Sequence, residues 1–422
     1  MSEKIVVSNE NELRNAINAA IEPTSIAIDN DITLTRTIVI PANKDITLTS
    51  NTTNSFYKLF GSPGLSSISD GSSTLTVANG GMLRLDGIVV THVSRFGSGV
   101  MVNSGGKLIM YSGEISGNNG NLGGGVFING SGSFMMLGGK IFGNDALCGG
   151  GVENFGGTFN MTGGEISGNT AWGGGGVYND GDFSMSGGKI FSNNVSTFGD
   201  RYGGGGVYNS GIFSMLGGEI SGNNAVGGGA GGGVNNIGVF SMSGGEISNN
   251  TVAGDGGGVF NSGTFSVFCG KISDNTASKS GGGIWVYDKN FKKLFVSDGV
   301  VFSNNRASEA VPNRRPEHDA IYVKQIGNNV IWTTPFTQGY NNYDISYTNI
   351  PPTSPEPSNS PTTPEPSVPP SSSESNQSIK SMLDSYLVKF TIAVIIVSCI
   401  IGGLVFLYKK NKLNDTSKSS RF

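Results

Sequence analysis

Apolar positions recur in a fixed order through most of the chain, and one unit is written almost twice between Asn160 and Asn194. Most copies contain a Gly-Gly-Glu-Ile or Gly-Gly-Lys-Ile element, and its isoleucine returns every 24 to 30 residues. The marker residues are Ile115, Ile141, Ile166, Ile190, Ile220, Ile247 and Ile272, with Val301 as a degraded eighth copy. Such a period predicts a solenoid, in which stacked units bury one continuous core.

Two further apolar markers keep their place in each unit. A phenylalanine or leucine lies seven residues before each marker, and a valine or isoleucine follows each Gly-Gly-Gly run. Three short apolar clusters per unit predict three short strands per coil. We therefore expect an all-β, right-handed parallel β-helix of about 25 residues per coil over residues 51–349, ending in a closing coil. The offset of seven is constant, so the variable length lies in one loop, before each glycine run.

The first 50 residues have a different pattern, which predicts a cap for the open end of the solenoid. Residues 10–22 place Leu13, Ala16, Ile17, Ala20 and Ile21 at helical spacing. Short alternating segments follow at 26–28, 32–34, 38–40 and 46–48. We expect one short capping helix and the first strands, because an uncapped coil would expose apolar rungs and strand edges.

Two polar positions also recur in every unit. An asparagine follows each marker by three residues and is expected to form a hydrogen-bonded ladder at one corner; the set is Asn118, Asn144, Asn169, Asn193, Asn223, Asn250, Asn275 and Asn304. A charged residue precedes each marker isoleucine, in the order Glu114, Lys140, Glu165, Lys189, Glu219, Glu246 and Lys271. Stacked in register, these residues form a largely charge-compensated outer face rather than an acidic site.

The C-terminal part is predicted to anchor the solenoid to a membrane. Residues 350–385 are rich in Pro, Ser, Thr and Glu, which predicts a disordered stalk. Phe390 to Tyr408 carries no charge and is long enough to cross a bilayer, so we expect a transmembrane helix within 386–408. A short basic tail, 409–422, follows. Its lysines favour a single-pass plasma-membrane protein with the repeat domain outside and the C-terminus in the cytoplasm.

Composition narrows the possible partners. The chain has 68 glycines and a net charge of -4, which gives no indication of nucleic-acid binding. Cys148 and Cys269 lie about five coils apart, over 20 Å at one strand spacing per coil, too far for a disulfide. We expect both to be small apolar fillers.

Residues typical of catalysis are sparse. The two histidines, His92 and His318, lie near opposite ends of the repeat region, and no pair of aspartates recurs on adjacent units. The calcium-binding repeat Gly-Gly-x-Gly-x-Asp does not occur in tandem; the segment 254–256 is a lone fragment. We expect no enzyme, no metal and no cofactor. A polysaccharide lyase or glycoside hydrolase on a β-helix scaffold is the alternative.

The variable loops are the expected binding region, because all insertions leave the solenoid at one corner. Aromatic and charged side chains together favour contacts with an extracellular glycan or protein. The candidate residues are Trp172, Phe198, Asp200, Arg201, Tyr202 and Asp255. Loops without any function remain an equally good explanation of these insertions.

The unit Gly-Gly-Glu-Ile-Ser-Gly-Asn resembles the Gly-Gly-Ala-Ile repeat of the polymorphic membrane proteins of chlamydial surfaces and of related adhesin-like β-helix proteins. The companion Phe-x-x-Asn motif of that family is matched at Phe191 to Asn194 and at Phe302 to Asn305. The resemblance covers about residues 70–305. It implies a surface-exposed β-helix with a role in adhesion.

The N-terminus, Met1 to Val7, lacks the charged and apolar regions of a signal peptide. The chain is therefore also compatible with a tail-anchored intracellular scaffold, or with a true signal that precedes the given start.

Overall fold

The computed structural model describes part of the chain in detail. The described residues are 4–52, 55–61, 73–92, 97–196, 203–226, 229–286, 293–297, 299–308, 323–326, 329–332 and 344–347. They belong to the first of two compact units, Met1–Thr353; the second unit is Ser354–Phe422. The predicted stalk, membrane helix and tail lie outside the described residues. Among those that are described, no helix is long and apolar enough to cross a membrane.

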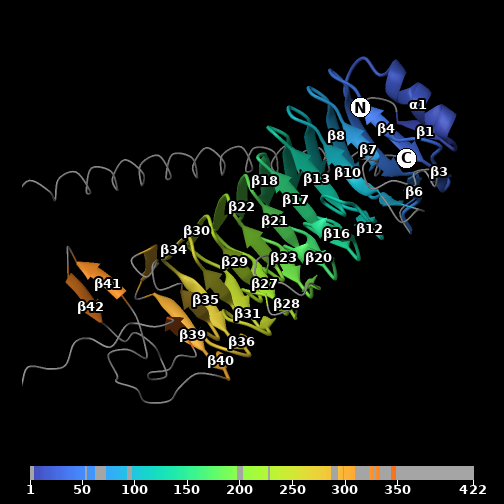
Figure 1. Ribbon diagram of the computed structural model, residues 1–422. Helices are drawn as coiled ribbons and strands as arrows, with labels where there is room; N and C mark the ends of the chain where they lie inside the picture. The colour runs from blue at the N-terminus through green and yellow to red at the C-terminus, as the bar shows by residue number, and fades with distance from the viewer. Residues whose placement is uncertain are drawn as a thin grey trace, which may run out of the picture. The chain divides into compact units, whose positions relative to one another are not determined.

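The first unit is a parallel β-solenoid of about ten turns with roughly 26 residues per turn, which confirms the solenoid predicted from the repeat (Figure 1). Each strand pairs in parallel with its counterpart one coil further on. The right-handed winding of the coils stays a prediction. The strands form three long sheets, here called A, B and C, and a shorter sheet D.

Sheet A contains twelve strands: β1 (Ile5–Val7), β2 (Thr24–Ile28), β5 (Asp45–Ser50), β8 (Met82–Asp86), β11 (Lys107–Met110), β14 (Ser133–Met136), β18 (Thr158–Met161), β22 (Asp182–Met185), β26 (Ile212–Met215), β30 (Val239–Met242), β34 (Thr264–Val267) and β38 (Leu294–Val296). Sheet B contains eleven: β3 (Ile32–Thr33), β6 (Lys58–Gly61), β9 (Val89–His92), β12 (Glu114–Ser116), β15 (Lys140–Phe142), β19 (Glu165–Ser167), β23 (Lys189–Phe191), β27 (Glu219–Ser221), β31 (Glu246–Ser248), β35 (Gly270–Ser273) and β39 (Val300–Ser303).

Sheet C also contains eleven strands: β4 (Ile38–Ile40), β7 (Ser73–Val77), β10 (Ser98–Val102), β13 (Val126–Asn129), β17 (Val152–Phe155), β21 (Val177–Asn179), β25 (Val207–Asn209), β29 (Val234–Asn236), β33 (Val259–Asn261), β37 (Ile284–Val286) and β43 (Ile345–Tyr347). A separate antiparallel hairpin consists of β41 (Val323–Ile326) and β42 (Asn329–Trp332).

Sheet D adds a fourth strand to the coils, where three per coil were expected. Its strands are β16 (Asp145–Cys148), β20 (Thr170–Gly173), β24 (Asn194–Val195), β28 (Asn224–Ala225), β32 (Thr251–Val252), β36 (Thr276–Ala277) and β40 (Arg306–Ala307). They occupy the start of the segment predicted to be loop. Each carries a buried alanine or valine that stacks on the next, so even this short segment has a reason to pair.

The N-terminal helix α1 (Glu10–Ala19) lies at the first end of the solenoid (Figure 1). It buries Leu13, Ala16 and Ile17, and the side chain of Asn9 caps its first turn by accepting a hydrogen bond from the Glu12 backbone. The helix is shorter than the predicted 10–22. Pro23 disfavours helical backbone before it, so Ile21 lies outside the helix and is 96% exposed.

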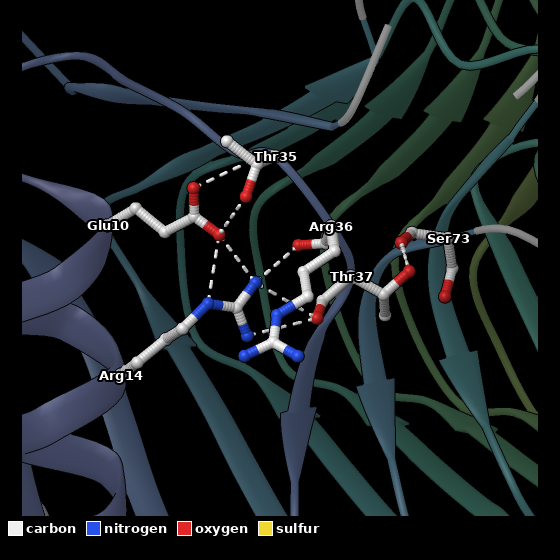
Figure 2. A network of polar contacts seen from close by, with 6 residues as sticks. All are labelled: Glu10, Arg14, Thr35, Arg36, Thr37 and Ser73. Atoms are coloured by element: carbon white, nitrogen blue, oxygen red, sulfur yellow. Dashed lines mark hydrogen bonds and ion pairs between the residues drawn. The ribbon is translucent and has the colours of Figure 1, made fainter. Parts of the chain in front are cut away.

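A polar network ties this helix to the segment between β3 and β4 (Figure 2). The Arg14 guanidinium donates to the Glu10 carboxylate, with an Nε to Oε1 distance of 2.9 Å, and to the carbonyl oxygens of Arg36 and Thr37. The Thr35 backbone N–H donates to Glu10 Oε2 at 2.7 Å. Partial burial alone would raise the pKa of Glu10, but the hydrogen bonds from Thr35 and Arg14 outweigh it and lower that pKa.

The core consists of columns of like side chains, because the coils stack in register. Phe159, for example, pairs with Phe183, and Met161 pairs with Met185. Six phenylalanine rings lie face to face along sheet A with centroid distances of 4.4 to 5.0 Å; they are Phe134, Phe159, Phe183, Phe213, Phe240 and Phe265. All six are buried. Each ring therefore gains contact from the coils on both sides.

The corner after sheet B contains a column of buried asparagines. In a typical step, Asn169 donates from its backbone N–H and from Nδ2 to Asn193 Oδ1, at 3.0 and 2.9 Å, and also from Nδ2 to the Ile141 carbonyl. The column runs through Asn118, Asn144, Asn169, Asn193, Asn223, Asn250, Asn275 and Asn305 to Asp344.

The last asparagine of this column was assigned wrongly from the sequence. Asn304 is exposed with φ 56°, and its neighbour Asn305 occupies the ladder. The cause is an extra residue between β38 and β39. Ile272 therefore pairs with Phe302 and not with Val301, so the position three residues later is 305.

A second asparagine ladder lies at the corner between sheets C and A, and sequence reasoning missed it. The Nδ2 of each member except the last donates to the Oδ1 of the next coil at 2.7 to 2.8 Å. Its members are Asn154, Asn179, Asn209, Asn236 and Asn261, all fully buried. The Gly-Val-x-Asn pattern carries this signal in the sequence.

The Gly-Gly pair before each sheet B strand is required by space at the corner. A Cβ on Gly163 would lie 2.4 Å from the Leu137 carbonyl oxygen of the previous coil, and Gly164 has φ 86°. Cys269 replaces the first glycine in its own coil. The backbone there is distorted, with φ 118° at Gly270, and Cys269 is exposed. The expectation that Cys269 is a buried filler was wrong.

Replacement of Asn193 by alanine is expected to destabilise the protein by about 2–5 kcal/mol, because it leaves several buried donors and acceptors without partners. Asn193 bonds both neighbouring coils, whereas Asn194 next to it is only partly buried. Urea unfolding of Asn193→Ala and of the matched control Asn194→Ala measures the difference. Equal midpoints for the two variants would contradict a ladder that stabilises the coils.

Candidate binding surface

The corner predicted to carry the binding loops forms a ridge along the solenoid, built from sheet D and the residues that follow its strands. The buried side chains of sheet D make a small cluster of their own, separate from the main core. Outward side chains alternate with them. The sheet D strands therefore give the ridge the same backbone arrangement in each coil, and the coils differ in the residues that follow these strands.

Trp172 is the most prominent apolar side chain on the ridge. It lies on β20 and is 54% exposed, next to Leu147 of the previous coil, which is 37% exposed. Val226, further along the ridge, is 53% exposed. An exposed tryptophan on a regular strand is unusual for a surface that contacts only water.

Asp255 serves the turn in which it lies. Its carboxylate accepts a hydrogen bond from the Ser280 backbone N–H at 2.9 Å, and its carbonyl oxygen accepts one from Gly231. These bonds join three successive coils. The other four candidate residues, Phe198, Asp200, Arg201 and Tyr202, lie outside the described residues.

The charged column of sheet B stacks in register as the repeat predicted. Lys140 pairs with Glu165, with Nζ to Oε2 at 3.4 Å, and Lys189 pairs with Glu219 at 2.8 Å. The hydrogen bond from Lys189 also lowers the pKa of Glu219. The step from Glu219 to Glu246 brings like charges together, and each of these two carboxylates bonds a different lysine.

An outward column on sheet C contains an acid that sequence reasoning missed. The column runs through Phe127, Glu153, Tyr178, Tyr208, Asn235, Phe260 and Trp285. Glu153 interrupts the aromatic residues, is 3% exposed, and accepts a hydrogen bond from the Gly123 backbone at 3.0 Å. The signal was the glutamate in the tyrosine position of Gly-Val-Tyr-Asn.

Burial changes the protonation of this region. It raises the pKa of Glu153 to about 8; the Gly123 hydrogen bond opposes the change and the nearby Asp180 adds to it. Burial, with a smaller contribution from Glu153, raises the pKa of the half-buried Cys148 thiol to about 11. Tyr178 also has a raised pKa, chiefly from burial and from Tyr208. At neutral pH this cluster is largely uncharged.

Within the part of the chain that the structure describes, no group of three or more His, Cys, Asp or Glu side chains is arranged to hold a metal ion. Comparison with protein-family models, with curated proteins and with solved structures finds no match for this chain. The candidate surface is therefore interpreted from its own residues alone.

Replacement of Glu153 by glutamine is expected to stabilise the protein above pH 8. The carboxyl has a pKa of about 8 in the folded protein against an ordinary 4.5. Its protonated form therefore stabilises the folded state fully below pH 4.5, and this stabilisation is lost as the pH rises to 8. Each unit of difference corresponds to about 1.4 kcal/mol. Thermal melts should show a higher Tm for Glu153→Gln than for wild type at pH 9 and similar values at pH 4.5.

The matched control for that experiment is Asp182→Asn, which neutralises an exposed carboxylate on the next coil. It should leave the pH profile of the Tm unchanged. A wild-type Tm that does not fall between pH 4.5 and 8 relative to Glu153→Gln would show that Glu153 ionises freely.

Proposed function

We propose that this chain is a membrane-anchored cell-surface protein, with a right-handed β-helix held outside the cell on the 350–385 stalk by a helix within 386–408. Its role is adhesin-like: the ridge binds an extracellular glycan or protein. The repeat and its resemblance to the polymorphic membrane proteins support this assignment. The other arrangement, a tail-anchored intracellular scaffold, makes the opposite prediction about access from outside.

The observation that carries the binding proposal is the exposed pair of Trp172 and Leu147 on regular strands of the ridge. Both side chains lie on rigid elements, so a partner that contacts them pays little ordering entropy on the protein side. A tryptophan that a partner covers on binding is also among the residues that most often contribute strongly to the binding free energy of an interface. The ridge thus presents two apolar side chains on regular strands, next to segments whose length and sequence differ from coil to coil.

A polysaccharide-active enzyme is the second candidate. Glu153, whose pKa is raised to about 8, and Asp180 of the next coil are the acids that favour it, because glycoside hydrolysis uses a pair of carboxyl groups of which one is protonated. Incubation with pectin, xylan and β-glucan tests this candidate. New reducing ends that disappear in Glu153→Gln would support the enzyme over the adhesin.

Replacement of Trp172 by alanine is expected to weaken binding to the ligand-bearing surface by tenfold or more, about 1.4 kcal/mol, as for an interface anchor. The full-length chain displayed on cells would be titrated onto epithelial monolayers and immobilised glycans. Ile212→Ala is the control, because Ile212 is 51% exposed but lies on sheet A. Equal losses in both variants, or none in Trp172→Ala, would contradict binding through the ridge.

The placement outside the cell predicts the result of protease treatment of intact cells. Blotting separately for the solenoid and for the C-terminal tail should show loss of the solenoid and survival of a tail fragment. A solenoid that is cut only after permeabilisation would instead support the intracellular scaffold.

A further inference from the structure

A groove of about 600 Å³ runs along the corner between sheets A and B, at the opposite end of the sheet B strands from the ridge. We call it the A–B groove. Its lining comprises a column of glycines, a column of charged residues and the less polar residues of the last two coils; these are Gly188, Gly218, Gly245 and Gly270, then Lys189, Glu219, Glu246 and Lys271, then Cys269, Gly299 and Val301.

The glycine column explains why a groove exists at this corner. Side chains are disfavoured here: Gly218 is held at φ 88° and a Cβ on it would lie 2.9 Å from the Gly188 carbonyl oxygen, and Gly245 is held at φ 89° in the same way. Two adjacent rows of glycines, with Gly187, Gly217 and Gly244 preceding Gly188, Gly218 and Gly245, leave a continuous channel beside the charged column. The depth of the groove thus follows from the packing of the coils. The packing does not require the charged and apolar residues that line the groove.

The charges of the groove balance within it. Lys189 Nζ lies 2.8 Å from Glu219 Oε2, and Lys271 Nζ lies 3.0 Å from Glu246 Oε1. A ligand of either charge would meet an equal number of repelling groups and would have to break an ion pair. A neutral ligand with many hydroxyls can bond the same side chains without breaking them.

These polar groups are both accessible and fixed. The four side chains are 32% to 55% exposed. Serines of sheet B hold the carboxylates, since Ser221 Oγ donates to Glu219 of its own strand at 2.5 Å and Ser273 Oγ donates to Glu246 of the previous coil at 3.3 Å. Such prior fixation reduces the ordering cost of a ligand that uses them.

The C-terminal end of the groove is bordered by exposed aromatic rings. Phe268, which precedes the lining residue Cys269, is 48% exposed, and Phe295 of the next coil is 39% exposed. Their centroids lie 5.4 Å apart at an interplanar angle of 45°, so the rings are tilted rather than stacked face to face. Exposed rings beside a polar groove suit a ligand that has apolar faces and hydroxyl edges.

We propose that the A–B groove binds a linear, uncharged glycan that lies along the solenoid axis. The lining extends over five coils, or about 19 Å at one strand spacing per coil. One coil is close to the length of a pyranose unit, so successive sugars meet successive Glu or Lys side chains. Phe268 and Phe295 receive the face of a sugar at the C-terminal end. This site goes beyond the ridge and does not depend on the ligand that the ridge binds.

The test is direct titration of the full-length chain in detergent with hexasaccharides. Uncharged probes are the β-1,4-glucan, β-1,3-glucan, β-1,4-mannan and β-1,4-xylan hexamers; charged probes are hexagalacturonate and the chitosan hexamer. At least one uncharged hexamer should bind with a Kd at least tenfold lower than either charged probe. Phe268→Ala should weaken it tenfold or more, and Lys271→Met several-fold.

Phe155→Ala is the matched control, because it removes an exposed phenylalanine of sheet C that lies in neither surface, and it should leave hexamer binding unchanged. The groove proposal is overturned if no uncharged hexamer binds or if a charged hexamer binds equally well. It is also overturned if an extended peptide binds in a way that requires Phe268 while the sugars do not bind.

A fourth result would separate the two surfaces. Glycan binding that is lost in Trp172→Ala but kept in Phe268→Ala overturns the groove proposal and leaves the function of the ridge intact. Unchanged thermal melts would show that the Phe268→Ala chain is folded.

Discussion

The buried asparagine amide is the interaction on which the rest of this structure depends. An amide offers two donors and an acceptor, and inside a protein each must find a partner. Asn193 meets this demand only by bonding Asn169 on one side and Asn223 on the other. A coil that slipped by one residue would leave several such groups unpaired. The two ladders therefore fix the register that the phenylalanine and isoleucine columns then fill.

That constraint decides where the coils are free to differ. Most insertions leave the solenoid between the first asparagine ladder and the glycine run, because no ladder passes through that segment. Outward positions are free as well. Glu153 and Trp172 depart from the repeat at such positions, and neither disturbs a ladder, whereas Cys269 departs from it at the glycine corner. The ridge and the A–B groove both follow from the need to keep the ladders in register. The ridge is formed by residues added between coils, and the groove by positions where side chains are absent.

Much of the fold follows from the sequence alone, since a repeat in register makes each residue a neighbour of its own counterpart. The marker isoleucines, the phenylalanine column and the charged column of sheet B could be located in this way. The assignment failed at Asn304, where one extra residue changed an offset that had been constant. It also missed sheet D, the fourth strand of the coils, because two to four residues around an alanine or valine give too little pattern to distinguish a strand from a loop.

The candidate sites were harder to predict, for a physical reason. The raised pKa of Glu153 depends on how deeply neighbouring coils bury it, and spacing does not reveal depth. The groove depends on glycines that looked purely structural. The exposure of Trp172, by contrast, could be expected from its place in a variable segment, and its binding role stays a prediction. Asp255, in a similar segment, bonds the turn in which it lies.

The proposed adhesin-like function depends most on the display of the solenoid outside the cell, and labelling of its cysteines measures this directly. Cys269 is exposed, whereas Cys148 is half-buried with its thiol pKa raised to about 11 and should react slowly at neutral pH. After mild reduction, a membrane-impermeant maleimide added to intact cells should label the wild-type chain and should fail to label Cys269→Ser. Labelling of the wild type that requires permeabilised cells would contradict the account.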